Sequence, residues 1–352
     1  MFGRSVLAPA SAAAASLAAV LLAVTGCKIQ VSDAAPGGAS TAGAVRAASP
    51  GVTRAGSLIV EPGAGFSPVY GLIKAARHTI DVTMYEFSDM TAEHDLAAAA
   101  RRGVRVRVIM DQRERSVNSA AYSYLSSHAV KVTWSSPRYR YTHQKTVVID
   151  GTEAVIMTAN LTSRYYATSR DFLVVDTSRA DVAAITAVFD ADFAHAAVRP
   201  GDGNDLVWSP TGSQDQLLGL IDGAAKSLRI YSEEMGDVTV ENALIRAAGR
   251  GVDVQVCGAN ESGQYDHAFA RLARAGVHIS YYSSPAGFYI HGKVIEADFG
   301  TPRARIFIGS ENFSGTSLND NRELGLIISD HSVMSAIAST FASNFRNGQH
   351  WS

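Results

Sequence analysis

The sequence predicts an α/β protein with two tandem, homologous sandwich domains, packed about a pseudo-twofold axis with an active site at their interface. Three observations lead to this fold class. The chain contains an internal repeat, each copy alternates strand and helix patterns, and the 352 residues are 18% charged and 47% hydrophobic. That composition excludes a wholly disordered chain and a polytopic membrane protein. The formal net charge of −2 argues against a protein that coats nucleic acid, although a local basic groove stays open.

The first 26 residues have the layout of an export signal. Arg4 precedes a run rich in Ala, Leu and Val that ends in VTGC. The small residues before Cys27 favour cleavage over an uncleaved membrane anchor, which is the alternative interpretation. The VTGC ending resembles a bacterial lipobox, which implies a diacylglyceryl group on Cys27. We therefore expect a signal peptide over residues 1–26 and an exported protein, lipid-anchored to the outer face of the bacterial cell membrane or secreted.

Residues 28–56 are predicted to form a disordered tether. They are rich in Ala, Gly, Ser, Thr and Pro and show no periodicity, so they cannot bury enough apolar surface to offset the entropy of ordering. The chain has two cysteines, Cys27 and Cys257. If Cys27 carries lipid, Cys257 has no disulfide partner within the chain, and we expect it to be a small buried hydrophobe.

The rest of the chain is a duplication. Matching segments begin at Leu58 and Leu206, at Leu72 and Leu220, and at Ala100 and Ala248, each pair 148 residues apart. The later segments that begin at Ala184 and Ala336 are 152 residues apart, so four residues are inserted between these markers. A stretch of turn residues, Pro200–Asp205, marks the boundary. We therefore predict domains over residues 57–200 and 201–352.

Each copy has the same order of elements. A strand is followed by an amphipathic helix, a buried strand such as residues 79–87, an Ala-rich helix, a strand at residues 104–110 or 252–258, further strands and a final helix. This alternation favours an α/β sandwich in each copy. Two such copies pack most simply face to face, as an isologous dimer does, so a site at their interface receives its residues twice.

The candidate site residues recur in both copies. The first copy supplies His143, Lys145, Asp150, Thr158, Asn160 and Asp171, and the second supplies His291, Lys293, Asp298, Ser310, Asn312 and Glu323. The His, Lys and Asp pairs keep the offset of 148, whereas the pairs from Thr158 onward keep 152. The four-residue insertion therefore lies within the motif, after Asp298.

Strand geometry suggests how these residues meet. His143 and Lys145 are two apart in a segment with strand composition, so both side chains leave the same face, while Asp150 has the opposite parity. Asp150-Gly151 is a hairpin signal, and the hairpin returns Thr158 and Asn160 to His143. Asp150 and Asp298 are therefore expected to be structural. In the second copy the insertion lengthens the turn over residues 299–304.

Two imidazoles, two ammonium groups and two carboxamides at one interface suit a phosphodiester. A neutral His can attack phosphorus to form a phosphohistidine, and a protonated His can donate to the leaving oxygen. Lys145, Lys293, Asn160, Asn312 and the hydroxyls of Thr158 and Ser310 are expected to bind the phosphate oxygens. Asp171 and Glu323 are each expected to accept a hydrogen bond from Nδ1 of the His of their own copy. This scheme requires no metal or other cofactor.

The segments HQKTVVID with MTAN, and HGKVIEAD with GSEN, resemble the paired HxK(x)4D and GSxN motifs of the phospholipase D superfamily. The resemblance covers both halves from about residue 57. It implies a metal-independent phosphohistidine mechanism with His143 as the nucleophile and His291 as the general acid. Met157 stands where the family usually has Gly, and we expect it to crowd the first half-site.

These observations predict a phospholipase D-type phosphodiesterase that hydrolyses glycerophospholipids to phosphatidate and headgroup, with transfer to other alcohols as an option. Its partners are a phospholipid and a membrane surface, with no obligate protein partner, and the duplication favours a monomer. The apolar residues 287–290 suit an acyl chain or a membrane. The alternative is a metal-independent extracellular nuclease, which needs a basic groove for which Arg138 and Arg140 are the clear candidates. A binding protein without catalysis is disfavoured, because the His, Lys and Asn residues are intact in both halves.

Overall fold

The computed structural model describes residues 55–283 and 287–352. The predicted signal peptide, Cys27 and nearly all of the predicted tether lie outside these residues. The first strand, β1 (Ala55–Glu61), includes the last two residues of the expected tether. Both repeats belong to one compact unit, Pro50–Ser352. Within the described residues no helix is long and apolar enough to cross a membrane.

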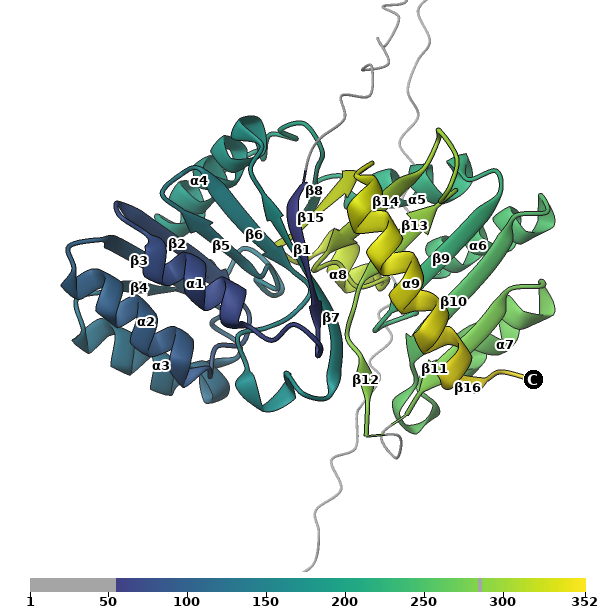
Figure 1. Ribbon diagram of the computed structural model, residues 1–352, viewed down its shortest axis with the longest axis horizontal. Helices are drawn as coiled ribbons and strands as arrows, with labels where there is room; N and C mark the ends of the chain where they lie inside the picture. Colours follow the sequence, from purple (N-terminus) through teal and green to yellow (C-terminus); the bar gives the residue numbers. More distant parts are fainter. Residues whose placement is uncertain (1–54, 284–286) are drawn as a thin grey trace, which may run out of the picture. The chain divides into compact units, whose positions relative to one another are not determined.

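The first repeat forms a mixed sheet in which β1 lies at one edge (Figure 1). The strand order is β1, β7 (Ser169–Asp176), β6 (Glu153–Met157), β5 (Thr146–Ile149), β2 (Thr79–Met84), β3 (Arg105–Met110) and β4 (Lys131–Trp134). Strands β2, β3 and β4 are parallel to one another, and the remaining neighbours in this order are antiparallel. All but the first residue of β2 are buried, as expected for a strand covered on both faces.

The second repeat forms a sheet with the same order. It runs β8 (Leu206–Ser209), β15 (Glu323–Ile328), β14 (Arg305–Gly309), β13 (Val294–Ala297), β9 (Ser227–Ser232), β10 (Asp253–Ala259) and β11 (His278–Tyr282), and β16 (Gln349–His350) extends it beside β11. Each strand from β8 to β15, apart from β12, therefore has a counterpart in the first sheet. The predicted pair of homologous α/β domains is confirmed.

Helices cover the outer face of each sheet and lie between the sheets (Figure 1). They are α1 (Ser67–Ala75), α2 (Met90–Arg101), α3 (Arg115–Ser127) and α4 (Arg179–Phe193) in the first repeat, and α5 (Ser213–Gly223), α6 (Val238–Gly249), α7 (Asp266–Arg274), α8 (Gly315–Asn319) and α9 (His331–Asn347) in the second. Short 3-10 turns occupy Ser163–Tyr165 and Glu261–Gly263. Asp89 and Asp237 cap α2 and α6, each accepting two main-chain N–H groups at the helix start.

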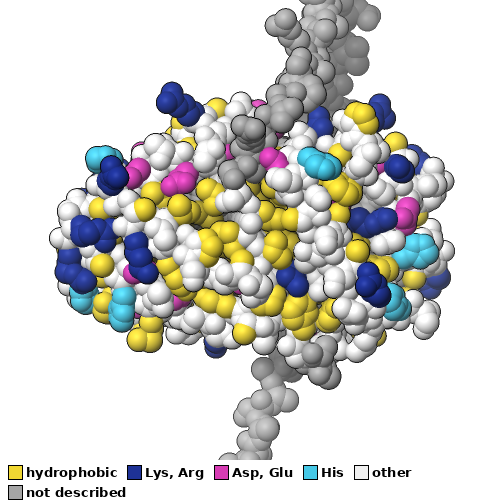
Figure 2. All heavy atoms as spheres, in the orientation of Figure 1, with side chains coloured by type: hydrophobic (Ala, Val, Ile, Leu, Met, Phe, Trp, Pro, Cys, Tyr) yellow, Lys and Arg dark blue, Asp and Glu magenta, His cyan; other side chains and the backbone are white. Residues whose placement is uncertain are grey.

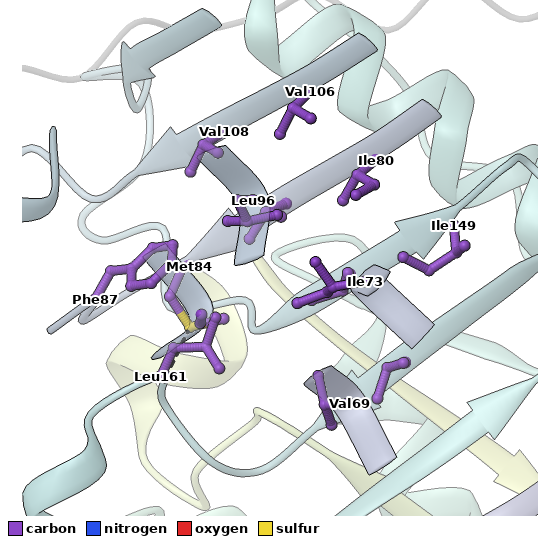
Figure 3. Packing of buried hydrophobic residues seen from close by; sticks show 14 of the residues in the cluster. Val69, Ile73, Ile80, Met84, Phe87, Leu96, Val106, Val108, Ile149 and Leu161 are labelled. Atoms are coloured by element: carbon purple, nitrogen blue, oxygen red, sulfur yellow. Dashed lines mark hydrogen bonds between the residues drawn. The ribbon is translucent and has the colours of Figure 1, made fainter. Parts of the chain in front are cut away.

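Three clusters of buried apolar side chains stabilise the unit. The outer cluster of the first repeat joins α1 and α2 to the sheet, and Figure 3 shows Val69, Ile73, Ile80, Met84, Phe87, Leu96, Val106, Val108, Ile149 and Leu161 within it. A second outer cluster serves the other repeat. The third lies between the repeats and includes residues of both sheets, of α4 and of α9. It contains Cys257, which is fully buried and free, as predicted.

Where the two repeats meet, a short segment of each one pairs with the main chain of the other. Strand β12 (Tyr289–Ile290) of the second repeat pairs in parallel with Ser169 and Arg170 at the start of β7. In the corresponding place of the first repeat, Thr142 bridges in parallel to Arg322, just before β15. Both contacts follow from one pseudo-twofold relation. In the view of Figure 1, apolar side chains gather along the middle of the face, and Lys and Arg side chains lie toward both ends (Figure 2).

Candidate active site

A cleft of about 660 Å³ lies between the repeats and is lined by residues of both. His143 and His291 line it together, as do Asn160 and Asn312. The doubled residues therefore meet in one place, as the repeat suggested.

The hairpin turns that follow the His-Lys segments are braced by Asp150 and Asp298. Asp150 has a φ of 53° and, with Gly151, joins β5 to β6. Its carboxylate accepts main-chain N–H groups of Arg77, His78 and Thr79 at distances of 2.7–3.2 Å. Burial raises the pKa of Asp150, but these donors bring it below its ordinary value.

Asp298 repeats the arrangement in the second half. It accepts N–H groups of Ala225, Lys226 and Ser227, and the donors likewise bring its pKa below the ordinary value against the effect of burial. The four extra residues lie in the longer turn between β13 and β14. Neither Asp298 nor Asp150 lines the cleft, so both hold the turn that presents the strands.

Each imidazole is held by a carboxylate from the opposite repeat. Nδ1 of His143 lies 2.8 Å from Oε2 of Glu323, and Nδ1 of His291 lies 2.7 Å from Oδ1 of Asp171. We expected each carboxylate to serve the His of its own copy, so the pairing is corrected here. Since Nδ1 faces a carboxylate in both cases, Nε2 is the nitrogen left for the cleft.

The short pairings between the repeats explain why each carboxylate serves the imidazole of the other repeat. The main-chain N–H of His143 donates to the carbonyl of Arg322 at 2.9 Å, and that of His291 donates to the carbonyl of Arg170 at 3.2 Å. The carboxylate residue follows each of these arginines directly. The strand contact between the repeats therefore sets the carboxylate of one beside the imidazole of the other.

Further hydrogen bonds fix the carboxylates. Glu323 is fully buried, and its Oε1 accepts from Ser317 Oγ at 2.6 Å and from Asn321 Nδ2 at 2.9 Å. Burial raises the pKa of Glu323, but His143, Lys145 and Ser317 bring it below its ordinary value. Burial lowers the pKa of His143, against the effect of Glu323. The pair is thus a carboxylate facing an imidazole that favours its neutral form.

The predicted hydroxyl donors lie behind the cleft rather than on its surface. Thr158 is fully buried, donates to Asp171 Oδ1 at 2.6 Å and accepts the N–H of Phe172 at 2.9 Å. Ser310 accepts the N–H of Leu324 at 3.1 Å. Neither lines the cleft, so our expectation that these hydroxyls contact the phosphate is corrected. They fix the strands that carry the carboxylates.

The two carboxamides do reach the cleft. Asn312 is 4% exposed, and its Oδ1 has no hydrogen-bond partner among the described residues. The side-chain oxygen of Asn160 accepts the N–H of Glu86 at 3.4 Å, and Asn160 lines the cleft. In both residues the amide nitrogen is the atom that can donate to a phosphate oxygen, because an amide oxygen only accepts.

The two lysines are buried beneath the imidazoles. Nζ of Lys145 donates to the carbonyl of His143 at 2.6 Å, and Nζ of Lys293 donates to the carbonyl of His291 at 2.5 Å. Burial lowers the pKa of Lys145 to about 7, and Lys293 acts in the same direction while Glu323 opposes it. Neither lysine lines the cleft, so the expectation that they contact the phosphate is corrected. A buried positive charge can still act on an anion in the adjoining cleft without contact.

Sequence reasoning missed the acidic side chains of the cleft and three of its aromatic ones. The acidic ones are Glu86, Glu233, Glu234 and Glu261, and the aromatic ones are Tyr85, Tyr165 and Tyr166. The repeat offset contained a signal, because it aligns Tyr85 with Glu233 and Glu86 with Glu234. These residues follow β2 and β9 directly, at the ends of the central parallel strands.

Two further expectations about the surroundings are corrected. Met157 does not crowd the site, because it is fully buried in the outer apolar cluster of the first repeat. Arg138 and Arg140 do not line the cleft. The segment containing them instead covers Arg322, whose guanidinium lies 4.3 Å from the ring centre of Tyr139.

No group of three or more His, Cys, Asp or Glu residues is arranged to hold a metal ion in residues 55–283 and 287–352.

The family model described as "Cardiolipin synthase, PLD-like domain" matches the chain twice, over residues 69–193 and 217–345. The chain belongs to the phospholipase D superfamily. It is a phosphodiesterase of that superfamily with two PLD-like domains.

Solved structures share the fold at low sequence identity. Phosphatidylserine synthase of Haemophilus influenzae Rd KW20 is 12% identical with a TM-score of 0.66, over 85% of this chain and 88% of that one. Polyphosphate kinase of Porphyromonas gingivalis is 16% identical with a TM-score of 0.65, over 83% of this chain and only 50% of that one. Nuc of Salmonella typhimurium, a phospholipase D family member, is 24% identical with a TM-score of 0.38, over 42% and 95%. No curated protein matches the chain in sequence.

Proposed function

We propose that this superfamily member hydrolyses glycerophospholipids to phosphatidate and a free headgroup, and can transfer the phosphatidyl group to other alcohols. The observation that carries the proposal is the pair of imidazoles in one cleft, each held through Nδ1 by a carboxylate. This arrangement leaves one Nε2 for attack and the other for proton transfer.

The proposed reaction has two displacements. Nε2 of His143 attacks phosphorus, the N–P bond forms, and the bond to the headgroup oxygen breaks as His291 gives that oxygen a proton. Water then gives a proton back to His291 and attacks phosphorus, the N–P bond breaks, and phosphatidate leaves. Asn160, Asn312 and the charges of the two lysines stabilise the phosphoryl oxygens in both steps.

The charge of the cleft favours a lipid over a nucleic acid. Among the described residues that line it, the basic side chains are the two histidines, whereas the acidic side chains are five in number: Glu86, Asp171, Glu233, Glu234 and Glu261. A nucleic acid needs cationic side chains along its phosphates. A headgroup with an ammonium group suits carboxylates and aromatic rings. Phe288 and Tyr289, in the segment expected to be apolar, line the cleft beside His291.

Apolar side chains near the cleft support an encounter with a membrane surface. In the part of the chain that the structure describes, the exposed large hydrophobic residues are Met90 (67% exposed), Val238 (58%) and Tyr165 (44%). Tyr165 lines the cleft, and Met90 and Val238 each follow a cleft-lining glutamate by four residues. We further propose that the protein is exported and held at the membrane by lipidated Cys27, on the sequence pattern alone.

The proposal is tested with the full chain, EDTA, mixed phospholipid vesicles and ethanol. The wild type is expected to release phosphatidate, phosphatidylethanol and headgroup, and His143→Ala and His291→Ala are each expected to abolish all three while the circular dichroism spectrum is retained. Phosphatidylethanol is diagnostic, because it requires a phosphatidyl group that waits on the enzyme for its acceptor. Cleavage of single-stranded DNA with no lipid turnover would instead establish the nuclease.

A further inference from the structure

We infer that Glu233 makes the two half-sites unequal: it stabilises the imidazolium of His291 and thereby leaves His143 to act as the nucleophile. The inference rests on the proposed two-histidine mechanism. It goes further by naming a residue that divides the two roles. Glu233 acts through His291 and is therefore a positioning residue.

Glu233 breaks a symmetry that the rest of the site keeps. The histidines, lysines, asparagines and orienting carboxylates all have counterparts in the other repeat. At the end of β9, however, Glu233 stands where Tyr85 stands at the end of β2, 148 residues earlier. An anionic side chain in one half thus corresponds to a phenol in the other.

In the second half, Glu233 contacts both the imidazole of His291 and the ammonium group of Lys293. Its Oε1 lies 3.6 Å from Nε2 of His291, and its Oε2 forms an ion pair with Nζ of Lys293. The hydroxyl of Tyr289 donates to Oε1 at 3.1 Å and holds the carboxylate in place. Burial raises the pKa of Glu233, but His291, Lys293 and His143 together bring it well below its ordinary value. Glu233 is therefore ionised when the cleft is empty.

In the first half, the corresponding contacts are with an aromatic ring. The ring of Tyr85 packs edge-on against His143 with 4.6 Å between centroids, and Nζ of Lys145 lies 5.0 Å from the centre of the same ring. The Tyr85 hydroxyl donates to Glu114 Oε1 at 3.0 Å. A half-buried ring next to His143 does not stabilise a positive charge on Nε2 as a carboxylate does.

The two imidazoles face different sets of charged groups. His291 meets Asp171 of β7 at Nδ1 and Glu233 after β9 at Nε2, with Lys293 and the phenol of Tyr289 nearby, and it also interacts with Glu86 after β2. His143 meets Glu323 of β15 at Nδ1, and the charges of Lys145 and Lys293 oppose its protonation. Carboxylates at both nitrogens of His291 favour its cation. His143 contacts one carboxylate, with Glu233 acting on it only at longer range, and its burial and the two ammonium groups favour its neutral form.

This division fits the order of the proposed reaction. A neutral His143 has a lone pair on Nε2 for phosphorus, and a cationic His291 has a proton for the headgroup oxygen. The phosphoryl group therefore lies on the side of His143, and the leaving alcohol lies on the side of His291.

The first test needs no substrate. Imidazoles of the full-length protein are labelled with ¹⁵N, and the signals of His143 and His291 are assigned by their loss in the two alanine variants. At neutral pH we expect the imidazolium fraction of His291 to exceed that of His143, and Glu233→Gln to reduce the difference. Asp202→Asn removes an exposed carboxylate elsewhere and should change neither signal. An unchanged difference in Glu233→Gln would overturn the inference whether or not the protein acts on lipids.

The second test separates proton donation from folding. Glu233→Gln is compared on a phosphatidyl ester of an aliphatic alcohol and on one of p-nitrophenol, whose leaving oxygen needs no proton. We expect kcat to fall by about 10²-fold on the first substrate, with KM and kcat on the second nearly unchanged. Equal losses on both would mean that Glu233 is merely structural. If the wild type cleaves neither ester, the proposed function fails and the ¹⁵N measurement alone decides the role of Glu233.

Discussion

Replacing Glu323 with glutamine tests the crossing of the carboxylates most directly. The carboxylate accepts three hydrogen bonds: from Ser317 at 2.6 Å and Asn321 at 2.9 Å on Oε1, and from His143 at 2.8 Å on Oε2. In Glu323→Gln the amide oxygen can keep the first two. The amide nitrogen then faces Nδ1 of His143, so Nδ1 must accept and the ring proton moves to Nε2.

The size of the effect follows from this tautomer. An Nε2 that carries a proton has no lone pair for phosphorus, and the corresponding change in a serine protease triad costs about 10⁴-fold in kcat. We expect a loss of about 10³-fold or more. The folded state loses one charge-assisted hydrogen bond, which is worth about 1.5–3 kcal/mol. The variant should therefore remain folded, and its melting temperature checks this.

Covalent labelling identifies which imidazole each carboxylate serves. Full-length protein is mixed with a ³²P-labelled phosphatidyl nitrophenyl ester, quenched in alkali and analysed for phosphohistidine. Glu323→Gln should form no adduct on His143, although the two residues belong to opposite repeats. The matched variant, Asp171→Asn, acts on His291 and should still form the adduct, because nitrophenol leaves without a proton. The reverse pattern would refute the exchange of carboxylates.

Three more predictions concern stability, the membrane and metals. Burial without a hydrogen-bond partner raises the pKa of Glu296 from 4.5 to about 7, so folding stability should fall as pH rises through that window. Glu296→Gln should therefore increase the free energy of unfolding at pH 8 by at most about 3 kcal/mol and leave it unchanged at pH 4. The melting temperature at the two pH values checks this. Met90→Ser with Val238→Ser should weaken vesicle binding and vesicle hydrolysis, with turnover of a monomeric short-chain phospholipid unchanged. EDTA should leave the rate unaltered, and inhibition that Mg²⁺ or Zn²⁺ reverses would disprove a metal-free mechanism.

The repeated residues of the site could be predicted because a repeat is visible within a single sequence. The constant offset paired His143 with His291, and the jump to 152 located the insertion in the turn after Asp298, where the structure has it. The same arithmetic could not tell which repeat supplies the carboxylate to a given His. Asp171 and Glu323 occupy equivalent places, so spacing within a copy is the same for either pairing.

The positions of Thr158 and Asn160 were predicted incorrectly in part because β6 ends earlier than the sequence pattern suggests. The hairpin was expected to return both Thr158 and Asn160 to His143, but β6 ends at Met157, so neither residue is held in the strand. Thr158 then faces Asp171 while Asn160 reaches the cleft. Glu233 was missed for a different reason. The candidate residues were those that recur in both repeats, and at Glu233 the repeats differ.

The exchange of carboxylates has a consequence for how such a site can evolve. Either repeat alone would hold an imidazole without its carboxylate, so neither is a functional ancestor unless two copies assemble. In an assembly of identical copies, every substitution appears on both sides of the axis, and Tyr85 could not become a glutamate on one side only. Covalent fusion removes that constraint. Once both copies share one gene, each imidazole can be selected for its own step, and the approximate symmetry records the stage before that division of labour.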